Sequence, residues 1–293
     1  MKICSACSAR FHSSGWICPS CGYAPPQVNG FPALAAEFAN SSDGFNPEYF
    51  EHLAGLEAGN FWFRSRNTLI LLLLKQHCPT LQSFLEIGCG TGFVLSGIAS
   101  TFPSASLTGA EIYSTGLQFA AHRVTGAQFM QMDARNIPFE SHFDALGAFD
   151  VLEHIEEDST VLAQICKTLK PSGIMILTVP QHPLLWSSQD VMACHVRRYT
   201  ARELKQKVSE AGFDIVDSGS FVALLLPLMW LSRCFDKNDK EGHHDAMAEL
   251  RIGKIANFIL SLFMYVELIF TRLGVRFPAG GSLFLVARRQ KLS

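Results

Sequence analysis

The chain has 293 residues, of which 24 are basic and 26 are acidic, so its formal net charge at pH 7 is −2. This balance excludes the overall positive charge with which nucleic-acid-binding proteins attract phosphates. Hydrophobic residues make up 48% of the sequence, yet we find no stretch of the roughly 18 to 20 apolar residues that a membrane span requires. The first residues, Met1 to Ser5, lack the apolar core of a signal peptide. We therefore expect a cytoplasmic protein whose cysteines stay reduced.

The N-terminus carries two closely spaced pairs of cysteines. Cys4 and Cys7 form the first C-x-x-C pair, and Cys18 and Cys21 form the second. Four thiolates can complete a tetrahedral Zn²⁺ site, and so short a segment would take its folding free energy from the metal. We predict a structural zinc ribbon with its linker over residues 1–30. A redox dithiol and unrelated free thiols are the alternatives.

The central part of the chain alternates between strand and helix patterns. A helix that contains Phe61 to Leu74 comes first, and we expect it to pack on a sheet just before the first strand. Strands are predicted near residues 83–88, 106–111, 127–132, 143–149, 173–179, 213–219 and 282–288, and helices near 91–101, 115–123, 158–170 and 201–211. Strands that alternate with helices favour a parallel sheet with helices on both faces.

One segment, residues 83–95, carries a glycine-rich turn. An apolar run ends in a glutamate, three glycines follow at alternate positions, and a helical pattern begins directly afterwards. Glycine adopts positive φ and has no Cβ, so the backbone of such a turn can approach a ligand closely. The N-terminus of the following helix favours a carboxylate or phosphate. The ligand contacts expected in this turn are Glu86, Gly88, Cys89, Gly90 and Gly92.

This turn resembles motif I of the class I S-adenosylmethionine (SAM) dependent methyltransferases, in which an acid precedes a G-x-G-x-G sequence. Later segments match the same family in order, up to Lys170–Gly173 before the fifth strand. The resemblance implies an α/β, Rossmann-like sheet of seven strands and SAM as the cofactor. The core would cover residues 31–220, and its last strand would lie in residues 282–293. A dinucleotide-binding fold is the alternative, because it uses a similar turn.

Residues at the ends of the next strands continue the implied cofactor site. Glu111 ends the second strand, where its two oxygens can accept hydrogen bonds from ribose hydroxyls. By the resemblance, Asp133 and Ala134 bind the adenine end of the cofactor. Phe149 and Asp150 are expected at the mouth of the pocket.

The amino-acid end of the cofactor needs a cation for its carboxylate. Arg66, which lies near Trp62 ahead of the first strand, is our candidate, with Arg64 as a second. The planar guanidinium suits a carboxylate. A surface charge with a packed stem is the alternative for both arginines.

The loop after the fifth strand is the expected acceptor site. Between Pro180 and Tyr199 it gathers imidazoles, a carboxylate, cations and aromatic rings, and similar segments occur in bacterial methyltransferases that act on small molecules and glycans. We predict that His182 or His195 acts as a general base that Asp190 orients. A structural role for each of the three is the alternative.

The segment 221–281 is an insert, because the family usually has a short hairpin between its last two strands. It contains an apolar run, Phe258 to Phe270, and the charge of Glu267 within this run argues against a membrane span. A helical cap buried against the sheet is one interpretation. The other is an apolar lid or surface that receives a lipid-linked or membrane-bound substrate.

Together these features indicate SAM-dependent methyl transfer to an oxygen or nitrogen of a small-molecule, glycan or lipid-linked acceptor. The expected place is the cytoplasm, or the inner face of the membrane through a peripheral contact of the insert. The ribbon leaves an rRNA or tRNA methyltransferase open, although Lys2 and Arg10 are few cations for following a phosphate backbone. A non-catalytic SAM-binding adaptor is the third hypothesis.

Overall fold

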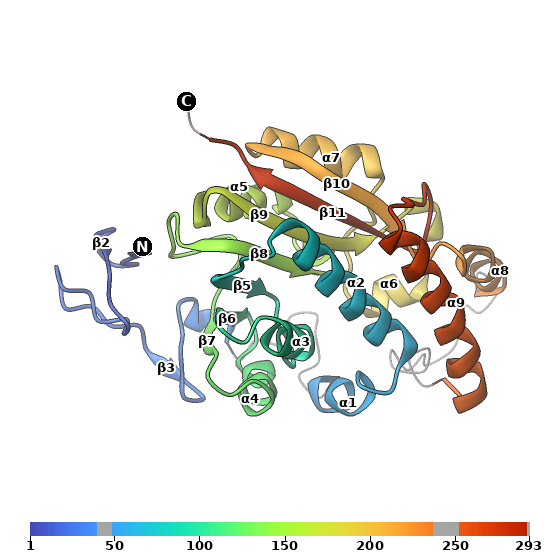
Figure 1. Ribbon diagram of the computed structural model, residues 1–293. Helices are drawn as coiled ribbons and strands as arrows, with labels where there is room; N and C mark the ends of the chain where they lie inside the picture. Colours follow the sequence, from blue (N-terminus) through green and yellow to red (C-terminus); the bar gives the residue numbers. More distant parts are fainter. Residues whose placement is uncertain (40–48, 237–251, 292–293) are drawn as a thin grey trace.

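Seven strands form the central sheet of the computed structural model, which describes residues 1–39, 49–236 and 252–291 (Figure 1). They are β5 (Ser83–Ile87), β6 (Ser106–Glu111), β7 (Gln128–Gln131), β8 (Phe143–Phe149), β9 (Leu169–Pro180), β10 (Phe213–Phe221) and β11 (Ser282–Arg289). Their order across the sheet is β10-β11-β9-β8-β5-β6-β7. β11 runs antiparallel to both neighbours and the other pairs are parallel. The carboxyl ends of the parallel strands therefore meet at one edge, and the predicted seven-stranded α/β fold is confirmed.

Helices cover both faces of the sheet, as expected (Figure 1). On one face lie α2 (Phe61–His77), α3 (Phe93–Thr101) and α4 (Ser114–Arg123), with α1 (Tyr49–Leu56) beside α4, and on the other lie α5 (Asp158–Thr168) and α7 (Ala201–Glu210). Successive side chains of a strand point to opposite faces. Phe84 accordingly joins the apolar cluster of the first face, whereas Leu85 and Ile87 join that of the second.

One boundary differs from the sequence-based expectation. α5 ends at Thr168 rather than at residue 170, and β9 begins at Leu169, which pairs with Phe143 of β8. Pro171 gives the physical reason, because proline disfavours helical backbone in the residue before it.

The N-terminal segment is joined to the β7 side of the sheet. Its short strands are β1 (Lys2–Ile3), β2 (Arg10–Phe11), β3 (Gln27–Val28) and β4 (Phe31–Pro32), followed by the 3-10 helix η1 (Ala36–Phe38). The N–H of Ile3 donates to the carbonyl of Pro138 over 2.9 Å, and a bridge from Ala33 to Gln131 follows the edge strand β7. The segment thus covers a strand edge that would otherwise be open to pairing.

The insert contributes α8 (Leu226–Asp236) and α9 (Lys254–Arg272). α9 packs along α2 (Figure 1), and its buried residues Met264, Glu267 and Thr271 form a single stripe. The N–H of Leu224 donates to the Glu267 carboxylate over 3.0 Å. The acid inside the apolar run therefore faces protein.

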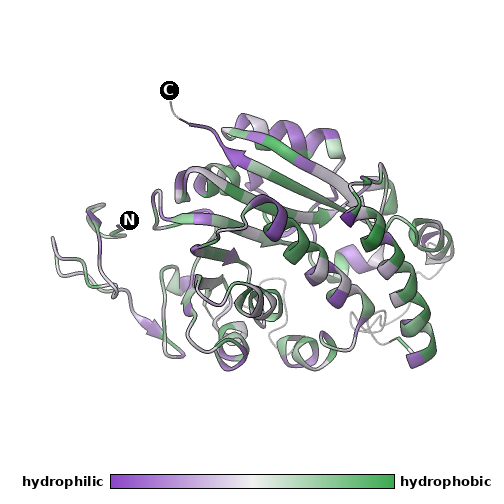
Figure 2. Cartoon of the chain, in the orientation of Figure 1, coloured by the Kyte–Doolittle hydropathy of each residue, from purple (hydrophilic) through white to green (hydrophobic). Residues whose placement is uncertain are grey.

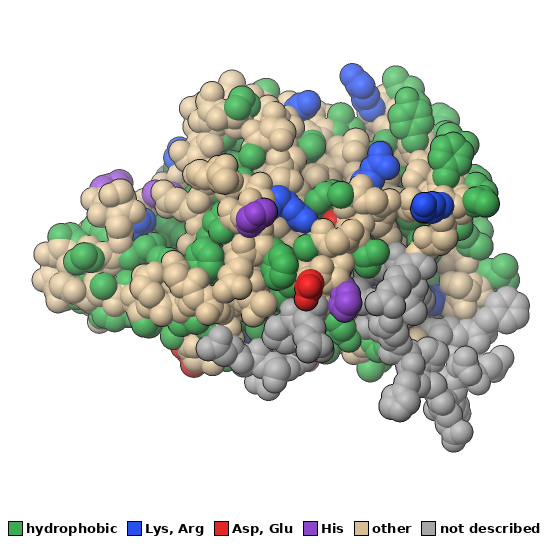
Figure 3. Space-filling model, turned by 90° about the horizontal axis from the view of Figure 1, so that it is seen from below, with side chains coloured by type: hydrophobic (Ala, Val, Ile, Leu, Met, Phe, Trp, Pro, Cys, Tyr) green, Lys and Arg blue, Asp and Glu red, His purple; other side chains and the backbone are tan. Residues whose placement is uncertain are grey.

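Most apolar side chains of α8 and α9 remain exposed. Figure 2 colours much of α8 and α9 as hydrophobic, and Figure 3 shows hydrophobic side chains over the right-hand end of the molecule, where these helices lie. This apolar surface includes Trp230, Ile255, Phe258, Leu262, Phe263 and Phe270. In the described part of the insert, α9 rests on α2 with one stripe and Val222, Leu225 and Met264 join the core cluster, so this part is a cap that is only partly buried.

The expectation that no segment is apolar enough to span a membrane also needs correction. By length and composition α9 could cross one, and 17% of its most apolar window is buried. The core helix of a soluble protein passes the same test, but such a helix is mostly buried. Most of α9 is exposed instead.

Candidate active site

The glycine turn between β5 and α3 has a backbone that only glycine adopts easily. Gly88, Gly90 and Gly92 have φ angles of 64°, 50° and 74°. A Cβ on Gly92 would lie 2.9 Å from Ala120, so this glycine also permits close helix packing. Among the described residues, the nearest neighbour of a Cβ on Gly90 would be the Phe50 ring at 3.8 Å. Of the three glycines, Gly90 therefore leaves the most room for a ligand in the described structure.

Glu111 joins the end of β6 to this turn. Its Oε2 accepts a hydrogen bond from the N–H of Gly90 over 3.0 Å, and its Oε1 accepts from Ile112 at 2.8 Å and Tyr113 at 3.3 Å. Burial raises the pKa of Glu111, while these backbone donors oppose the rise. Each carboxylate oxygen accepts about two hydrogen bonds, so Oε2 keeps room for one more. The geometry suits one ribose hydroxyl rather than both.

Asp133 lies beyond the end of β7, as predicted for the adenine end. Its Oδ1 accepts from the Arg135 N–H over 2.8 Å, and the Arg135 Nε lies 3.1 and 3.0 Å from its two oxygens. The neighbouring Ala134 is buried. The arginine therefore fixes the orientation of the carboxylate.

A buried donor and a buried acceptor lie near the ends of β5 and β8. The Arg66 guanidinium pairs with Asp150 and stacks over Trp62, 4.4 Å from the ring centre. Among the described residues, Arg66 Nε and Glu86 Oε2 are buried without a hydrogen-bond partner. Burial raises the pKa of Glu86 well above its usual range, and the nearby charge of Arg66 opposes that rise. An unpartnered donor and an unpartnered acceptor at this edge of the sheet suit the two charged ends of an amino acid.

Two predicted cofactor contacts lie in the core instead. The N–H of Cys89 donates to the carbonyl of Ala110 over 3.0 Å, and its thiol is buried in the apolar cluster. Phe149 is 5% exposed, and its ring lies over Gly147, where an added Cβ would meet it at 2.3 Å. The expectation that Phe149 stands at the pocket mouth is wrong, because this ring fills the space above a glycine of its own strand.

The loop after β9 brings the predicted Asp190 and His195 together. It contains the 3-10 helix η3 (Pro183–Leu185) and α6 (Ser188–Met192). His195 Nδ1 lies 2.8 Å from Asp190 Oδ1, and Arg198 Nε donates to the same oxygen over 2.7 Å. Burial alone would raise the pKa of Asp190, but the hydrogen bonds from His195 and Arg198 lower it to about 2.

His182 does not join this pair. Its backbone has a φ of 63°, and its N–H donates to the carbonyl of Tyr199 over 3.0 Å. In the described part of the chain its Nε2 is buried without a partner, as are Thr178 Oγ1 and Gln181 Oε1. Unpaired buried polar atoms are rare in proteins. Their concentration near the carboxyl ends of β5, β8 and β9 indicates a site for a polar ligand.

Two further residues enter the site to which the sequence analysis assigned no role, although they lie in a segment that resembles the family's L-E-H pattern after the fourth strand. The 3-10 helix η2 (Leu152–His154) follows β8 and carries Glu153 and His154. Glu153 is 0% exposed, and neither of its oxygens has a hydrogen-bond partner among the described residues. Burial raises the pKa of Glu153 well above its usual range, and the charge of Asp150 adds to this. Only the fold shows this burial, whereas the Leu152-Glu153-His154 pattern itself is visible in the sequence.

The four N-terminal cysteines also meet. Cys4 Sγ lies 3.7 Å from Cys21 Sγ, and Cys7 Sγ lies 3.7 Å from Cys18 Sγ. All four sulfurs lie within 4.8 Å of one another. In a tetrahedral zinc site with bonds of ~2.3 Å, the sulfurs lie ~3.8 Å apart. The donor set and its spacing fit zinc.

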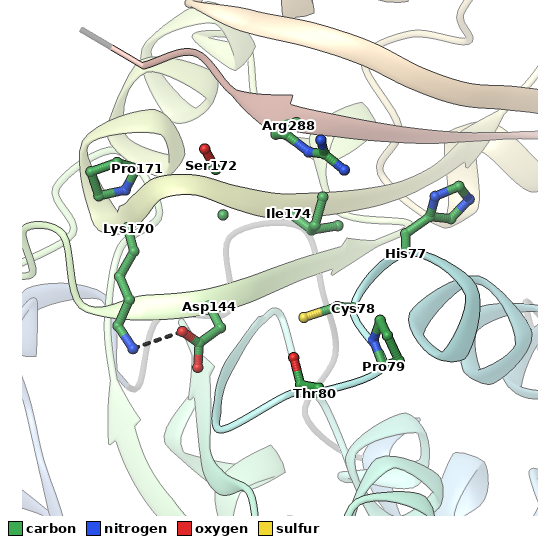
Figure 4. A pocket seen from close by; sticks show the side chains of 11 residues that line it. His77, Cys78, Pro79, Thr80, Asp144, Lys170, Pro171, Ser172, Ile174 and Arg288 are labelled. Carbon is green, nitrogen blue, oxygen red and sulfur yellow. Dashed lines mark hydrogen bonds and ion pairs between the residues drawn. The ribbon is translucent and has the colours of Figure 1, made fainter.

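A cavity of about 280 Å³ lies at the opposite edge of the sheet (Figure 4). Cys78 and Thr80 line it together with Arg288, and the Lys170 Nζ donates to Asp144 Oδ1 across its margin over 2.7 Å. Asp144 and Lys170 lie at the amino ends of β8 and β9, and Cys78 and Thr80 lie just before β5. Since ligands of parallel sheets bind at the carboxyl ends, this cavity is not the candidate cofactor site.

Comparison with known proteins gives consistent relatives. A family model described as a methyltransferase domain matches residues 59–218. A probable SAM-dependent methyltransferase of Mycobacterium tuberculosis is 25% identical over 170 residues, which are 57% of this chain and 61% of the relative. A fatty-acid O-methyltransferase of Mycolicibacterium smegmatis is 33% identical over 97 residues, 32% of this chain and 35% of the relative. The chain thus spans less than two thirds of each of these curated relatives.

Solved structures share the fold at low sequence identity. A phosphoethanolamine N-methyltransferase of Haemonchus contortus, in complex with SAM, has a TM-score of 0.57 at 19% identity, covering 87% of this chain and 60% of that one. The [4+2]-cyclase SpnF has a TM-score of 0.50 at 20% identity, covering 76% and 81%. A shared fold with a cyclase means that the fold alone does not define the activity. Because the family model covers more than half of the sequence, from the helix before β5 into β10, this chain belongs to the methyltransferase-domain family.

Proposed function

We propose that this chain transfers the methyl group of SAM to an oxygen of a fatty-acid or lipid-like acceptor. The family match supports methyl transfer. Two relatives are named for apolar acceptors, the fatty-acid O-methyltransferase and a phthiotriol/phenolphthiotriol dimycocerosates methyltransferase of Mycobacterium ulcerans. The observation that carries the proposal is the group of buried, unpartnered polar atoms beside the glycine turn.

The residues at this edge of the sheet fit SAM. Glu111 Oε2 would accept from a ribose hydroxyl, and Asp133 from the adenine amino group. Arg66 Nε would donate to the carboxylate of the cofactor, and Glu86 Oε2 would accept from its ammonium group. Both are unpartnered buried atoms in the described structure, which is the support for this assignment.

Positioning is the main contribution of the protein to such a reaction. When bound, SAM supplies an electrophilic methyl group on a sulfonium. Asp190 bonds His195 Nδ1, so Nε2 is the nitrogen that faces Glu153 and the site. A neutral imidazole held in this way can accept a proton or bind a metal ion through Nε2. His182, with its unpartnered Nε2, is the other candidate base.

The apolar surface supports an acceptor that comes from a membrane. Exposed aromatic and aliphatic side chains line α9, and the exposed cations Lys254 and Arg272 stand at its two ends. Helices of this kind lie in the interface of anionic bilayers. We therefore propose a cytoplasmic enzyme that touches the inner face of the membrane through α8 and α9.

The full chain should transfer labelled methyl from SAM to the carboxylate or hydroxyl oxygen of a long-chain lipid. A Phe258→Asp variant should slow transfer at least about tenfold when the lipid is embedded in anionic vesicles, since a buried charge opposes insertion. Transfer to a short-chain acceptor dispersed in water should change little, and Val216→Asp, at an exposed apolar position on β10, serves as the matched control. Label that enters tRNA or rRNA, with none in the lipid fraction, would refute the proposal.

We also propose that the four cysteines bind structural zinc. Both fixed cations of the ribbon are already engaged: Lys2 Nζ donates to the carbonyls of Ser14 and Gly15, and Arg10 Nη2 donates to Glu140 over 3.0 Å. Because both cations are engaged, this arrangement favours a ribbon that supports the core over one that binds a nucleic-acid backbone.

Removing zinc with a strong chelator should unfold residues 1–30 and leave the core folded. Because metal binding supplies the folding energy of so small a segment, proteolysis should then cut within the ribbon. Cys18→Ser should behave like the chelated protein, whereas Cys166→Ser, in the core, should keep one zinc per chain. A zinc content that Cys18→Ser does not change would contradict this assignment.

A further inference from the structure

We propose that Glu153, His154 and His195 bind a divalent transition-metal ion that holds the oxygen of the methyl acceptor. This inference rests on the proposed function and extends the same site. The ligand atoms of the three side chains lie within 4.8 Å of one another. Nitrogens or oxygens bound to one ion at ~2.1 Å lie at most ~4.2 Å apart. Movements of the ligand atoms by less than about 1 Å would therefore bring all three within this limit.

Glu153 is the observation that points to an ion. Its side chain is 0% exposed, and both oxygens lack a hydrogen-bond partner among the described residues. Buried carboxylates are normally paired, hydrogen-bonded or bound to a metal. Glu153 Oε1 lies 4.0 Å from His195 Nε2. The carboxylate therefore faces an imidazole nitrogen at a distance too long for a hydrogen bond.

Other contacts orient His195 toward Glu153. Asp190 Oδ1 lies 2.8 Å from His195 Nδ1, and Arg198 holds the same carboxylate. The N–H of Val196 donates to the Glu153 carbonyl over 2.7 Å, which fixes the loop to η2. A carboxylate on the far nitrogen is the usual partner of a metal-binding histidine, since it fixes the tautomer that leaves the near nitrogen unprotonated.

The third residue, His154, is the exposed member of the three. Its ring centre lies 4.8 Å from that of His195, and of the other two residues Glu153 is buried and His195 is partly buried. Three protein ligands leave coordination positions for a substrate, as in catalytic sites. Two imidazoles and one carboxylate select Mn²⁺, Fe²⁺, Co²⁺ or Zn²⁺ over Mg²⁺ or Ca²⁺, which prefer oxygen.

The proposed metal site lies close in sequence to residues that we expect to bind the cofactor, and this position indicates how the ion would act. η2 begins two residues after Asp150, whose partner Arg66 is our candidate for the cofactor carboxylate. A cation next to a hydroxyl or carboxylic acid lowers its pKa and fixes its orientation. The ion would thus favour the deprotonated acceptor oxygen without a strong protein base.

Binding of Mn²⁺ to the full chain, with its cysteine cluster saturated with zinc, tests the inference. Mn²⁺ prefers oxygen and nitrogen ligands over thiolates, so its electron paramagnetic resonance signal reports this site. We expect one bound Mn²⁺ per chain. Glu153→Gln and His195→Ala should each weaken its binding at least tenfold, whereas His182→Ala, a neighbouring imidazole outside the triad, should leave its Kd within twofold.

Different results would refute the metal site and the proposed methyl transfer. Chelation should abolish methyl transfer and leave SAM binding, measured by calorimetry, unchanged. Transfer that persists in chelator, or Mn²⁺ binding that Glu153→Gln does not weaken, would overturn the metal site while the proposed function stands. Absence of transfer to every acceptor, with Mn²⁺ bound as expected, would instead refute the proposed function. Glu153→Gln keeps the size of a buried side chain that has no hydrogen-bond partner among the described residues, so its thermal unfolding in chelator should match that of the unsubstituted chain.

Discussion

Glu111→Ala is expected to raise the dissociation constant for SAM at least about 100-fold, or roughly 2.8 kcal/mol. The carboxylate has two tasks at the end of β6. It accepts the N–H of Gly90 and thereby holds the glycine turn, and its Oε2 keeps room for a ribose hydroxyl. Hydrogen bonds to a charged group contribute about 1.5–3 kcal/mol each. Loss of both hydrogen bonds should therefore weaken SAM binding more than a substitution at an exposed position does.

Isothermal calorimetry with SAM measures this loss directly. Glu111→Gln keeps one acceptor oxygen, so about tenfold weaker binding is expected. Glu210→Ala, at an exposed position on α7, is the matched control and should leave the Kd unchanged. Asp133→Ala should weaken binding in the same direction, through the adenine end. Unchanged affinity in Glu111→Ala, with the fold intact by circular dichroism, would remove the ribose assignment.

Asp190→Ala is expected to destabilise the protein by about 3–5 kcal/mol, because it leaves the buried Arg198 without its carboxylate. Asp190 is 1% exposed and Arg198 is 8% exposed. Asp190 also belongs to the capping box that begins α6, in which its Oδ2 accepts the N–H of Ser187 over 2.9 Å. One substitution thus removes an ion pair, a helix cap and the partner of His195. Chemical unfolding in urea gives the change in free energy.

The pH dependence of stability gives a second signature of Asp190. Its pKa is lowered to about 2 from the ordinary 3.8, so the unfolded chain takes up the proton first as the pH falls. The stabilisation is therefore complete above about pH 4 and is lost as the pH falls toward 2. The free-energy difference between the unsubstituted chain and Asp190→Asn should shrink across that window.

A matched ion pair separates stability from function. Asp217 on β10 accepts from Arg276 Nε and Nη2, each over 2.7 Å, and it lies outside the candidate site. Asp217→Asn should lower stability but leave kcat unchanged. Asp190→Asn should lower kcat as well, since His195 loses the charge that fixes its tautomer. Equal kcat in both variants would assign Asp190 a structural role.

Local rules explain why so much of the central sheet was predictable. Phe84, Leu85 and Ile87 alternate between the two faces because a strand places successive side chains on opposite sides. Gly88, Gly90 and Gly92 follow at positions where the backbone needs positive φ. Glu86 and Glu111 end parallel strands, so topology alone brings them to one edge. Each of these inferences depends on a few neighbouring residues.

The sequence by itself thus determined the seven strands, the glycine turn, the acids at its edge and the four-cysteine cluster, because steric and periodic constraints act over short distances. Only the tertiary structure decided that Phe149 turns into the core, that Arg66 meets Asp150, that Glu153 is buried without a hydrogen-bond partner among the described residues and that α9 leaves its apolar side exposed. Burial and pairing depend on which distant segments meet. That information is set by packing across the whole chain.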